Sequence, residues 1–159
     1  MKITRLNHAV LFVRSATLSA KFYADAFGFV KAFGRGEDAI FMRAANSTND
    51  HDLGLFSLGA NAGDTTAGRS SVGLYHLAWQ VESLTDLLVM RERLMAMNAL
   101  TGESDHGTTK SLYGRDIDGI EFEVMWLVPP DVIIDDDRAN AGNTRRVNWD
   151  KVRSDYPAH

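Results

Sequence analysis

The sequence Leu-Asn-His-Ala-Val-Leu-Phe-Val-Arg-Ser at residues 6–15 returns, in altered form, as Leu-Tyr-His-Leu-Ala-Trp-Gln-Val-Glu-Ser at residues 74–83. At an offset of 68 residues, four pairs coincide, which are Leu6/Leu74, His8/His76, Val13/Val81 and Ser15/Ser83. Each stretch is typical of a strand that ends at a serine able to cap a following helix. Such a recurrence predicts one structural unit written twice.

The residues after each serine continue the same plan in both halves. A helical pattern follows first, with Leu18, Phe22 and Ala26 on one face of the first helix and Gly28 where that helix should end. Strands are then expected near residues 29–34, 39–44 and 52–58 and near residues 101–104, 109–116 and 120–127. The Gly-, Ala-, Ser- and Thr-rich stretch 57–73 is the expected linker between two β-α-β-β-β halves.

Composition narrows the class of protein. The chain has 159 residues, a formal net charge of −4 and no cysteine, so it has no disulfide and no thiolate metal ligand. It has no run or stripe of Lys and Arg of the kind that binds nucleic acid, and no apolar run long enough to span a bilayer. The absence of cysteine also fits a reducing cytoplasm, so we expect a cytoplasmic protein without a nucleic-acid or membrane partner.

The last thirty residues differ in character from the repeat. Pro129 and Pro130 end the final strand, and acidic and basic clusters follow, with Trp149 and Tyr156 further on. We expect residues 129–159 to form an arm with little regular structure. Its aromatic side chains favour packing against the domain, and a frayed surface tail is the alternative.

Strand parity places the candidate ligands. Alternate residues of a strand face opposite sides, and the bulkier apolar set should face the helix. This assigns His8, His76 and Glu123 to the other, concave face, together with Glu121, whose role stays open. A carboxylate facing two imidazoles in a cleft needs a partner, because its desolvation is costly. Two histidines and one carboxylate around an ion with open positions are typical of non-haem Fe(II) oxygenases.

A sequence motif in the second half resembles that of a known protein family. Residues 106–123 read His-Gly-Thr-Thr-Lys-Ser-Leu-Tyr-Gly-Arg-Asp-Ile-Asp-Gly-Ile-Glu-Phe-Glu. Over residues 3–128 the chain resembles the vicinal oxygen chelate superfamily, and this segment is similar to the signature of its type I extradiol ring-cleavage dioxygenases. The signature positions fall on His106, Tyr113, Asp116, Gly119 and Glu123, and Ile117 stands where that family usually has proline.

The resemblance implies an α+β fold in which two tandem βαβββ modules, about residues 1–60 and 70–128, form a half-barrel cleft around a metal site. Residues 1–128 would then be one domain, usually in a homo-oligomer of two or more copies. The implied ion is Fe(II), with Mn(II) as the alternative, on His8, His76 and Glu123. The implied reaction opens the ring of a small aromatic diol with O₂.

The resemblance also implies roles for three residues beside the metal. His51 opens the segment His-Asp-Leu-Gly-Leu-Phe, which is similar to a family strand whose first histidine transfers protons. An exposed loop histidine is the alternative reading of His51. Tyr113 would hydrogen-bond a bound oxygen, and His106 would orient the substrate or Tyr113.

Two other functions use the same scaffold. A glyoxalase-like metal-dependent isomerase or lyase usually needs a second carboxylate from the first half. Direct alignment places Leu55 opposite Glu123, and a two-residue slip places Leu53 there, so both alignments put an apolar residue at that position. A metal-free drug-binding protein would have no use for the two histidines and Glu123 together.

Overall fold

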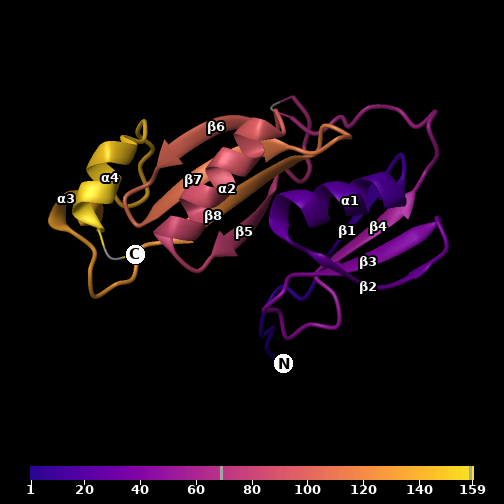
Figure 1. Cartoon of the computed structure of the whole chain (residues 1–159), viewed down its shortest axis with the longest axis horizontal. Coiled ribbons are helices and arrows are strands. Elements are labelled where there is room, and N and C mark those ends of the chain that lie inside the picture. Colours follow the sequence, from indigo (N-terminus) through magenta and orange to yellow (C-terminus); the bar gives the residue numbers. More distant parts are fainter. Residues whose placement is uncertain (69, 158) are drawn as a thin grey trace. The chain divides into compact units, whose positions relative to one another are not determined.

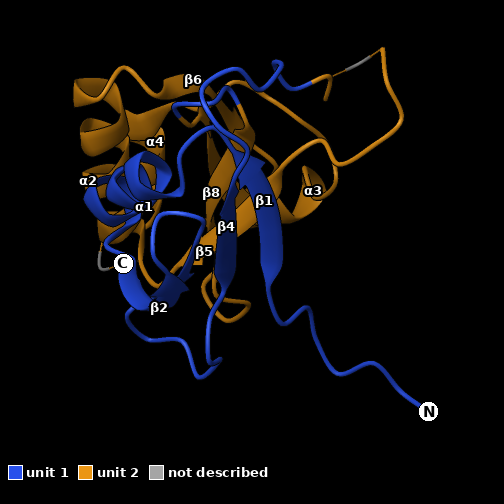
Figure 2. Cartoon of the chain, turned by 90° about the vertical axis from the view of Figure 1, so that its right-hand side faces the viewer, with its two compact units in different colours: residues 1–65, 117–119 blue, residues 66–116, 120–159 orange. Residues whose placement is uncertain are grey.

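The computed structural model describes residues 1–68, 70–157 and 159, which form two compact units. Unit 1 comprises residues 1–65 and 117–119, and unit 2 comprises residues 66–116 and 120–159 (Figure 2). Each unit contains a four-stranded sheet and a long helix (Figure 1). The expectation of an α+β fold with two tandem modules is therefore confirmed.

Unit 1 holds the first copy of the repeat. Its elements are β1 (Ala9–Val13), α1 (Ala16–Phe27), β2 (Val30–Arg35), β3 (Ala39–Arg43) and β4 (Leu53–Ser57). The strand order is β1-β4-β3-β2, with β1 parallel to β4 and the other pairs antiparallel. The outer strand β1 therefore lies beside the last strand of its own module.

Local sequence signals set both ends of α1. The Ser15 side chain accepts a hydrogen bond from the Leu18 amide at 3.3 Å and so caps the first turn. Gly28 ends the helix with a φ of 70°, a left-handed conformation that glycine adopts without strain. The expected helix face is confirmed at Phe22 and Ala26, which are buried with Tyr23, and was wrong at Leu18, which is exposed.

Unit 2 repeats the plan. Its elements are β5 (Leu77–Val81), α2 (Leu84–Ala96), β6 (Leu100–Asp105), β7 (Thr109–Arg115) and β8 (Glu121–Leu127). The order is β5-β8-β7-β6, and β5 is parallel to β8. Ser83 accepts a hydrogen bond from the Asp86 amide at 3.0 Å, as expected of a serine that caps the helix.

Each sheet buries one face. In unit 1 the residues facing α1 include Leu11, Val13, Leu53 and Leu55, all below 10% exposure. In unit 2 they include Phe122, Val124 and Trp126 of β8, which pack near α2. The alternation in β8 leaves Glu121, Glu123 and Met125 on the other face, half-buried, as parity predicts.

The C-terminal arm is more regular than its sequence indicated. It contains α3 (Asp135–Ala139) and α4 (Trp149–Asp155), so the expectation of little regular structure was wrong. The expected aromatic packing is present in unit 2, where the rings of Trp126 and Tyr156 meet edge to face with centroids 5.3 Å apart. The helices are short, and contacts with the sheet rather than helical propensity stabilise them.

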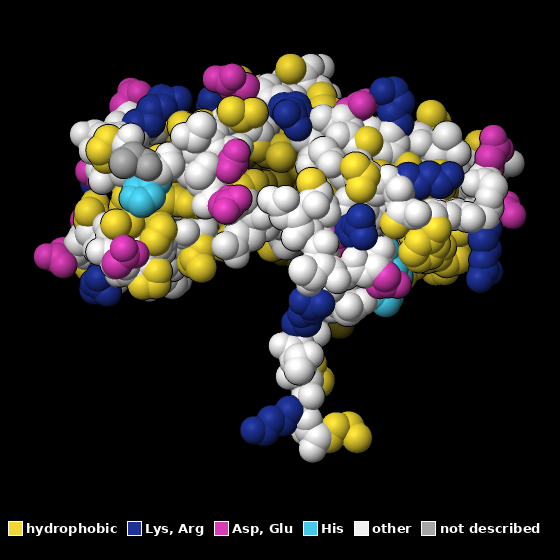
Figure 3. All heavy atoms as spheres, turned by 60° about the horizontal axis from the view of Figure 1, so that its bottom comes forward, with side chains coloured by type: hydrophobic (Ala, Val, Ile, Leu, Met, Phe, Trp, Pro, Cys, Tyr) yellow, Lys and Arg dark blue, Asp and Glu magenta, His cyan; other side chains and the backbone are white. Residues whose placement is uncertain are grey.

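The N-terminal residues 1–7 are exposed and project from the body of unit 1 (Figures 2 and 3). None of the helices in the described part of the chain is both long and apolar enough to cross a membrane.

Candidate metal centre

Two of the three predicted ligands meet in unit 2. His76 directly precedes β5, and Glu123 lies in β8, whose parallel register places it opposite Ala78. His76 Nε2 lies 3.1 Å from Glu123 Oε2, and both side chains are largely buried, at 23% and 13% exposure. The parallel pairing of β5 with β8 thus brings an imidazole and a carboxylate from distant parts of the sequence together.

Tyr113 extends this pair on the neighbouring strand. Antiparallel pairing of β7 and β8 sets Tyr113 opposite Glu123, and its hydroxyl lies 3.4 Å from Glu123 Oε1. On its other side, Tyr113 Oη lies 2.9 Å from His106 Nε2. Burial, and next the charge of Glu123, raise the pKa of Tyr113 to about 12, so the phenol is neutral at pH 7.

The remaining signature residues shape the turn between β7 and β8. The Asp116 carboxylate accepts a hydrogen bond from the Ile120 amide at 2.9 Å, and Gly119 has a φ of 79°. Glu121 forms an ion pair with Arg115 at 2.5 Å on the half-exposed face. Asp116 and Gly119 thereby set the register in which Glu123 faces Tyr113.

The third predicted ligand lies in unit 1. His8 directly precedes β1, and its Nδ1 lies 2.8 Å from Asn7 Oδ1. A carboxamide oxygen only accepts, so Nδ1 carries the proton and Nε2 presents a lone pair. That is the tautomer a metal ligand needs, and a hydrogen bond of this kind orients ligand histidines in metalloproteins.

His51 lies beside His8. Their ring centroids are 4.3 Å apart, and the rings of Phe33 and Phe41 contact His51 edge-on at 5.5 and 5.0 Å. Only 8% of His51 is exposed, and its Nδ1 lies 3.0 Å from the carboxylate of Asp50. The alternative of an exposed loop histidine is therefore wrong.

The position in unit 1 that corresponds to Glu123 is a glycine. Gly54 pairs with Val10 in β1/β4, as Glu123 pairs with Ala78 in β5/β8. Our alignments had placed Leu55 or Leu53 there, and both were wrong, because these leucines are fully buried against the helix side. Unit 1 therefore offers no carboxylate at the position equivalent to Glu123.

The residues of unit 2 fit a divalent ion. Two donor atoms that each lie about 2.1 Å from one ion at right angles are about 3 Å apart, close to the His76–Glu123 separation. Within the described residues, no group of three or more His, Cys, Asp or Glu side chains is assembled as a metal site. His8 belongs to unit 1 and the other two ligands to unit 2, so the complete triad remains a prediction.

Sequence reasoning missed the neighbours of His106. Its Nδ1 lies 3.2 Å from the Asn143 carbonyl oxygen and 3.1 Å from Thr144 Oγ1, both in the C-terminal arm. No local pattern signals such a contact, because the two segments are separated by 37 or 38 residues.

Comparisons with known proteins agree on the family. The family model described as "Glyoxalase/Bleomycin resistance protein/Dioxygenase superfamily" matches residues 5–124. A glyoxylase/bleomycin resistance protein/dioxygenase domain from Frankia sp. EAN1pec is 27% identical, with a TM-score of 0.64, and the match covers 79% of this chain and 93% of that one. A search of the curated proteins finds no match.

Two further solved structures share the fold at lower identity. Lactoylglutathione lyase from Agrobacterium tumefaciens is 17% identical, with a TM-score of 0.60 and coverage of 79% of this chain and 96% of that one. The fosfomycin resistance protein FosX from Listeria monocytogenes, in a mutant complexed with Mn(II) and 1S,2S-dihydroxypropylphosphonic acid, is 22% identical, with a TM-score of 0.58 and coverage of 77% and 90%.

Proposed function

The chain belongs to the glyoxalase/bleomycin resistance protein/dioxygenase superfamily, and we propose that within it the protein is an Fe(II)-dependent extradiol dioxygenase that opens an aromatic diol with O₂. The proposed ligands are His8, His76 and Glu123. The observation that carries the proposal is the contact of Glu123 with both His76 and Tyr113, which sets a neutral phenol beside the proposed ligand pair.

Gly54 supports a site with three protein ligands. A fourth carboxylate, as glyoxalase-type isomerases usually use, would be expected from unit 1 at the position equivalent to Glu123, and that position has no side chain. Three protein ligands would leave a bound ion with open positions for the diol and for dioxygen. The donor set therefore favours the oxygenase over the four-ligand isomerase.

The chain's own residues handle protons and orientation. A bound divalent ion supplies Lewis-acid activation of the diol hydroxyls. Tyr113 presents its hydroxyl beside Glu123 and can hydrogen-bond a substrate oxygen held there. His51, next to His8, is the proposed group that transfers a proton to or from the substrate, and such positioned groups contribute about 10²–10⁴ in rate.

The surroundings of His51 favour an aromatic substrate. Phe33 and Phe41 stack with centroids 4.6 Å apart, and Phe56 meets Phe41 edge-on at 5.7 Å. Phe12 on the same sheet is 68% exposed, and its ring meets Phe56. Aromatic side chains attract a flat ring through edge-to-face and offset contacts.

The test is oxygen consumption by protein loaded anaerobically with Fe(II) and mixed with a panel of catechols. We expect stoichiometric O₂ uptake and the yellow absorbance of a ring-opened product with at least one catechol. Zinc-loaded protein and Fe(II)-loaded Glu123→Ala serve as controls and should consume no oxygen. Tight iron binding without O₂ uptake across the panel would contradict the proposal.

The likeness to FosX favours a second candidate. That relative was solved with Mn(II) and a phosphonate, so a Mn(II)-dependent enzyme acting on a phosphonate is the alternative. Protein loaded with Mn(II) and mixed with fosfomycin, followed by ³¹P NMR, separates the two, since the dioxygenase should leave the phosphonate signal unchanged.

A further inference from the structure

The C-terminal arm adds a short backbone pairing to the end of β6. The Asp105 amide donates to the Arg145 carbonyl at 2.9 Å, and the Arg145 amide donates back to the Asp105 carbonyl at 2.9 Å. This two-way exchange is the pattern of an antiparallel bridge. His106 is the next residue along the chain, so the bridge fixes the backbone from which its imidazole projects.

Buried charges anchor the bridge. Lys110 is 1% exposed, and its ammonium donates to Asp105 at 2.7 Å, Asp137 at 2.8 Å and the Gly107 carbonyl at 3.1 Å. Arg145 donates to Asp105 at 2.9 Å and to Asp137 at 2.5 Å. Two cations thus neutralise two buried carboxylates, one from the sheet and one from the arm. Removal of the arm would leave Lys110 and Asp105 buried with fewer partners, which is costly.

Gly107 allows the arm to pack directly on the β6–β7 turn. Its φ is 77°, and a Cβ atom there would lie 2.2 Å from the Asp137 carbonyl oxygen and 2.9 Å from the Asn140 carbonyl carbon. Both neighbours are backbone atoms of the arm, so no side-chain rotation relieves the clash. The sequence therefore requires glycine at the point where the arm meets the turn that carries His106.

The contact of His106 with the arm selects one tautomer. Its Nδ1 lies 3.2 Å from the Asn143 carbonyl oxygen, which only accepts hydrogen bonds. Nδ1 therefore carries the proton, and its hydrogen bond is shared between the Asn143 carbonyl oxygen and the Thr144 hydroxyl oxygen, which lies 3.1 Å away. A neutral imidazole protonated on Nδ1 has a lone pair on Nε2, so the single Tyr113 hydroxyl proton goes to Nε2 over 2.9 Å rather than to the more distant Glu123 Oε1 at 3.4 Å.

We infer that residues 143–145 of the C-terminal arm are a positioning segment that holds His106 in the Nδ1–H tautomer and thereby turns the Tyr113 hydroxyl proton toward His106 and its lone pairs toward the site. Tyr113 then acts as a hydrogen-bond acceptor for a substrate hydroxyl. That use of Tyr113 rests on the proposed function, whereas the tautomer of His106 does not.

The tautomer is directly measurable by long-range ¹H–¹⁵N NMR of protein labelled with ¹⁵N-histidine. The chain has five histidines, and a His106→Gln variant assigns the His106 signals. In the full-length protein without metal, at a pH where His106 is neutral, we expect the Nδ1–H pattern. Arg145→Gln should convert it to a mixture with the Nε2–H form, because the bridge loses its side-chain anchor.

Two further variants keep the test decisive if Arg145→Gln does not fold. Gly107→Ala pushes the arm away without changing a charge and should also give a mixture of tautomers. Arg153→Gln removes a cation that forms an exposed ion pair with Asp150 on α4, and it should leave the His106 signals unchanged.

The outcomes separate cleanly. An Nε2–H pattern in the unaltered protein, an unchanged Nδ1–H pattern in folded Arg145→Gln and Gly107→Ala, or an equal change in Arg153→Gln would each overturn the inference. An Nδ1–H pattern in a protein that consumes no O₂ with any catechol would remove the proposed function and leave the role of the arm in place.

Discussion

The two sheets share one topology and register but carry opposite chemistry on their open faces. In unit 1, β3 and β4 set Phe41 opposite Gly54. At the same register in unit 2, β7 and β8 set Tyr113 opposite Glu123. Unit 1 thus has a phenyl ring beside a glycine, which has no side chain. At the equivalent position unit 2 has a phenol beside a carboxylate.

This contrast separates what the scaffold fixes from what side chains supply. The register places Phe41 and Tyr113 at equivalent positions. Of the two pairs, Phe41/Gly54 and Tyr113/Glu123, only the second can hold an ion and a proton. Unit 1 has an apolar aromatic surface around His51, and unit 2 has the polar network of Tyr113 and His106. A shared fold therefore constrains positions and leaves the reaction to the residues placed there.

The largest effect should come from Glu123, where the two units differ most. Glu123→Ala should lose most bound iron, a loss greater than the about 10–100-fold typical of removing an outer hydrogen-bond partner of a ligand. Metal analysis after anaerobic loading measures it. The matched control is Glu121→Ala on the same strand face, whose carboxylate pairs with Arg115. Equal iron in both variants would remove Glu123 from the ligand set.

Substitution of His51 asks whether unit 1 takes part in the chemistry. His51→Phe should keep iron content near that of the unaltered protein and lower catechol turnover by about 10²–10⁴, because a positioned proton-transfer group is lost. Steady-state O₂ uptake with an iron determination measures both. Turnover within about twofold of the unaltered protein would show that His51 does not transfer the proton.

Substitution of Lys110 tests a charge cluster that belongs to unit 2. Lys110→Met leaves Asp105 and Asp137 with one cation fewer and should cost about 3–5 kcal/mol in the free energy of unfolding. Urea unfolding measures it. The matched control is Lys21→Met in unit 1, whose exposed pair with Asp25 contributes about 0.3–0.5 kcal/mol. Similar losses in both variants would contradict the assigned role of burial.

Acid should weaken the stabilisation that the same charge cluster provides. Burial acts to raise the pKa of Asp105, but hydrogen bonds from Lys110, Gly107 and Arg145 outweigh it and hold that pKa below its usual value. The stability that Asp105 contributes is therefore complete above its ordinary pKa of about 3.9 and is lost as the pH falls through the lower folded value. Unfolding measured between pH 5 and 2 should lose less stability in Lys110→Met.

The smallest effect should be at Gly54. An added Cβ would lie 3.4 Å from Phe41 and Val10, so Gly54→Ala should change the free energy of unfolding by no more than about 1 kcal/mol. Gly114→Ala in unit 2 should cost about 1–3 kcal/mol, because its Cβ would lie 2.4 Å from the Phe122 ring. Thermal unfolding of the two variants provides the comparison, and a Gly54→Ala cost equal to that of Gly114→Ala would show that both positions are closely packed.

Much of the fold could be predicted from short-range signals. Alternating residues located the strands, and Ser15, Ser83 and Gly28 located the helix ends. The position equivalent to Glu123 was missed by one residue, since the offset between halves is 68 at β1/β5 and 69 at β4/β8. A single inserted residue reverses strand parity, which is why Leu55 seemed to occupy the place of Gly54.

The candidate site likewise has a part that could be predicted from the sequence and a part that could not. The pairing of His76 with Glu123 and the line from Glu123 through Tyr113 to His106 follow strand register and a signature segment. The arm's contact with His106 depends on Lys110, Arg145 and a left-handed Gly107, which act together only after folding. Neither α3 nor α4 has a periodic apolar face long enough to predict a helix from sequence.

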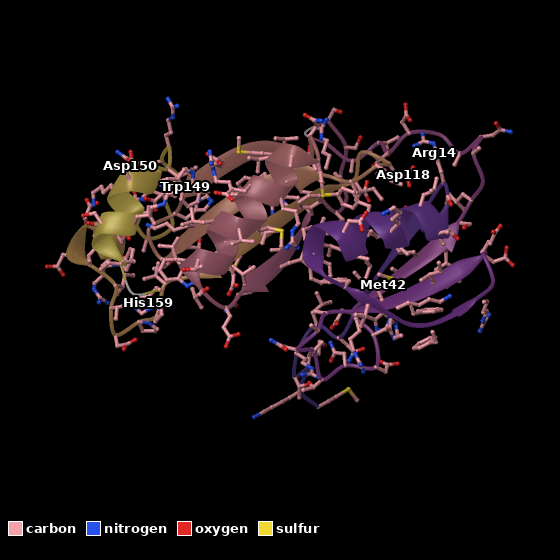
Figure 4. All side chains as sticks on the ribbon, in the orientation of Figure 1. Arg14, Met42, Asp118, Trp149, Asp150 and His159 are labelled. Carbon is pink, nitrogen blue, oxygen red and sulfur yellow. The ribbon has the colours of Figure 1, made fainter. Side chains whose placement is uncertain are left out.

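The turn that ends at Gly119 gives unit 1 a noncontiguous sequence. Asp118 accepts from the Arg14 amide at 3.1 Å and forms an ion pair with the Arg14 guanidinium at 2.9 Å (Figure 4). Because residues 117–119 belong to unit 1, a gene fragment that stops at residue 65 encodes a first half that keeps Asp64 at Arg14 but lacks Asp118. The boundary between the two sequence repeats and the boundary of unit 1 therefore do not coincide, and a cut in the linker separates residues 117–119 from the rest of unit 1.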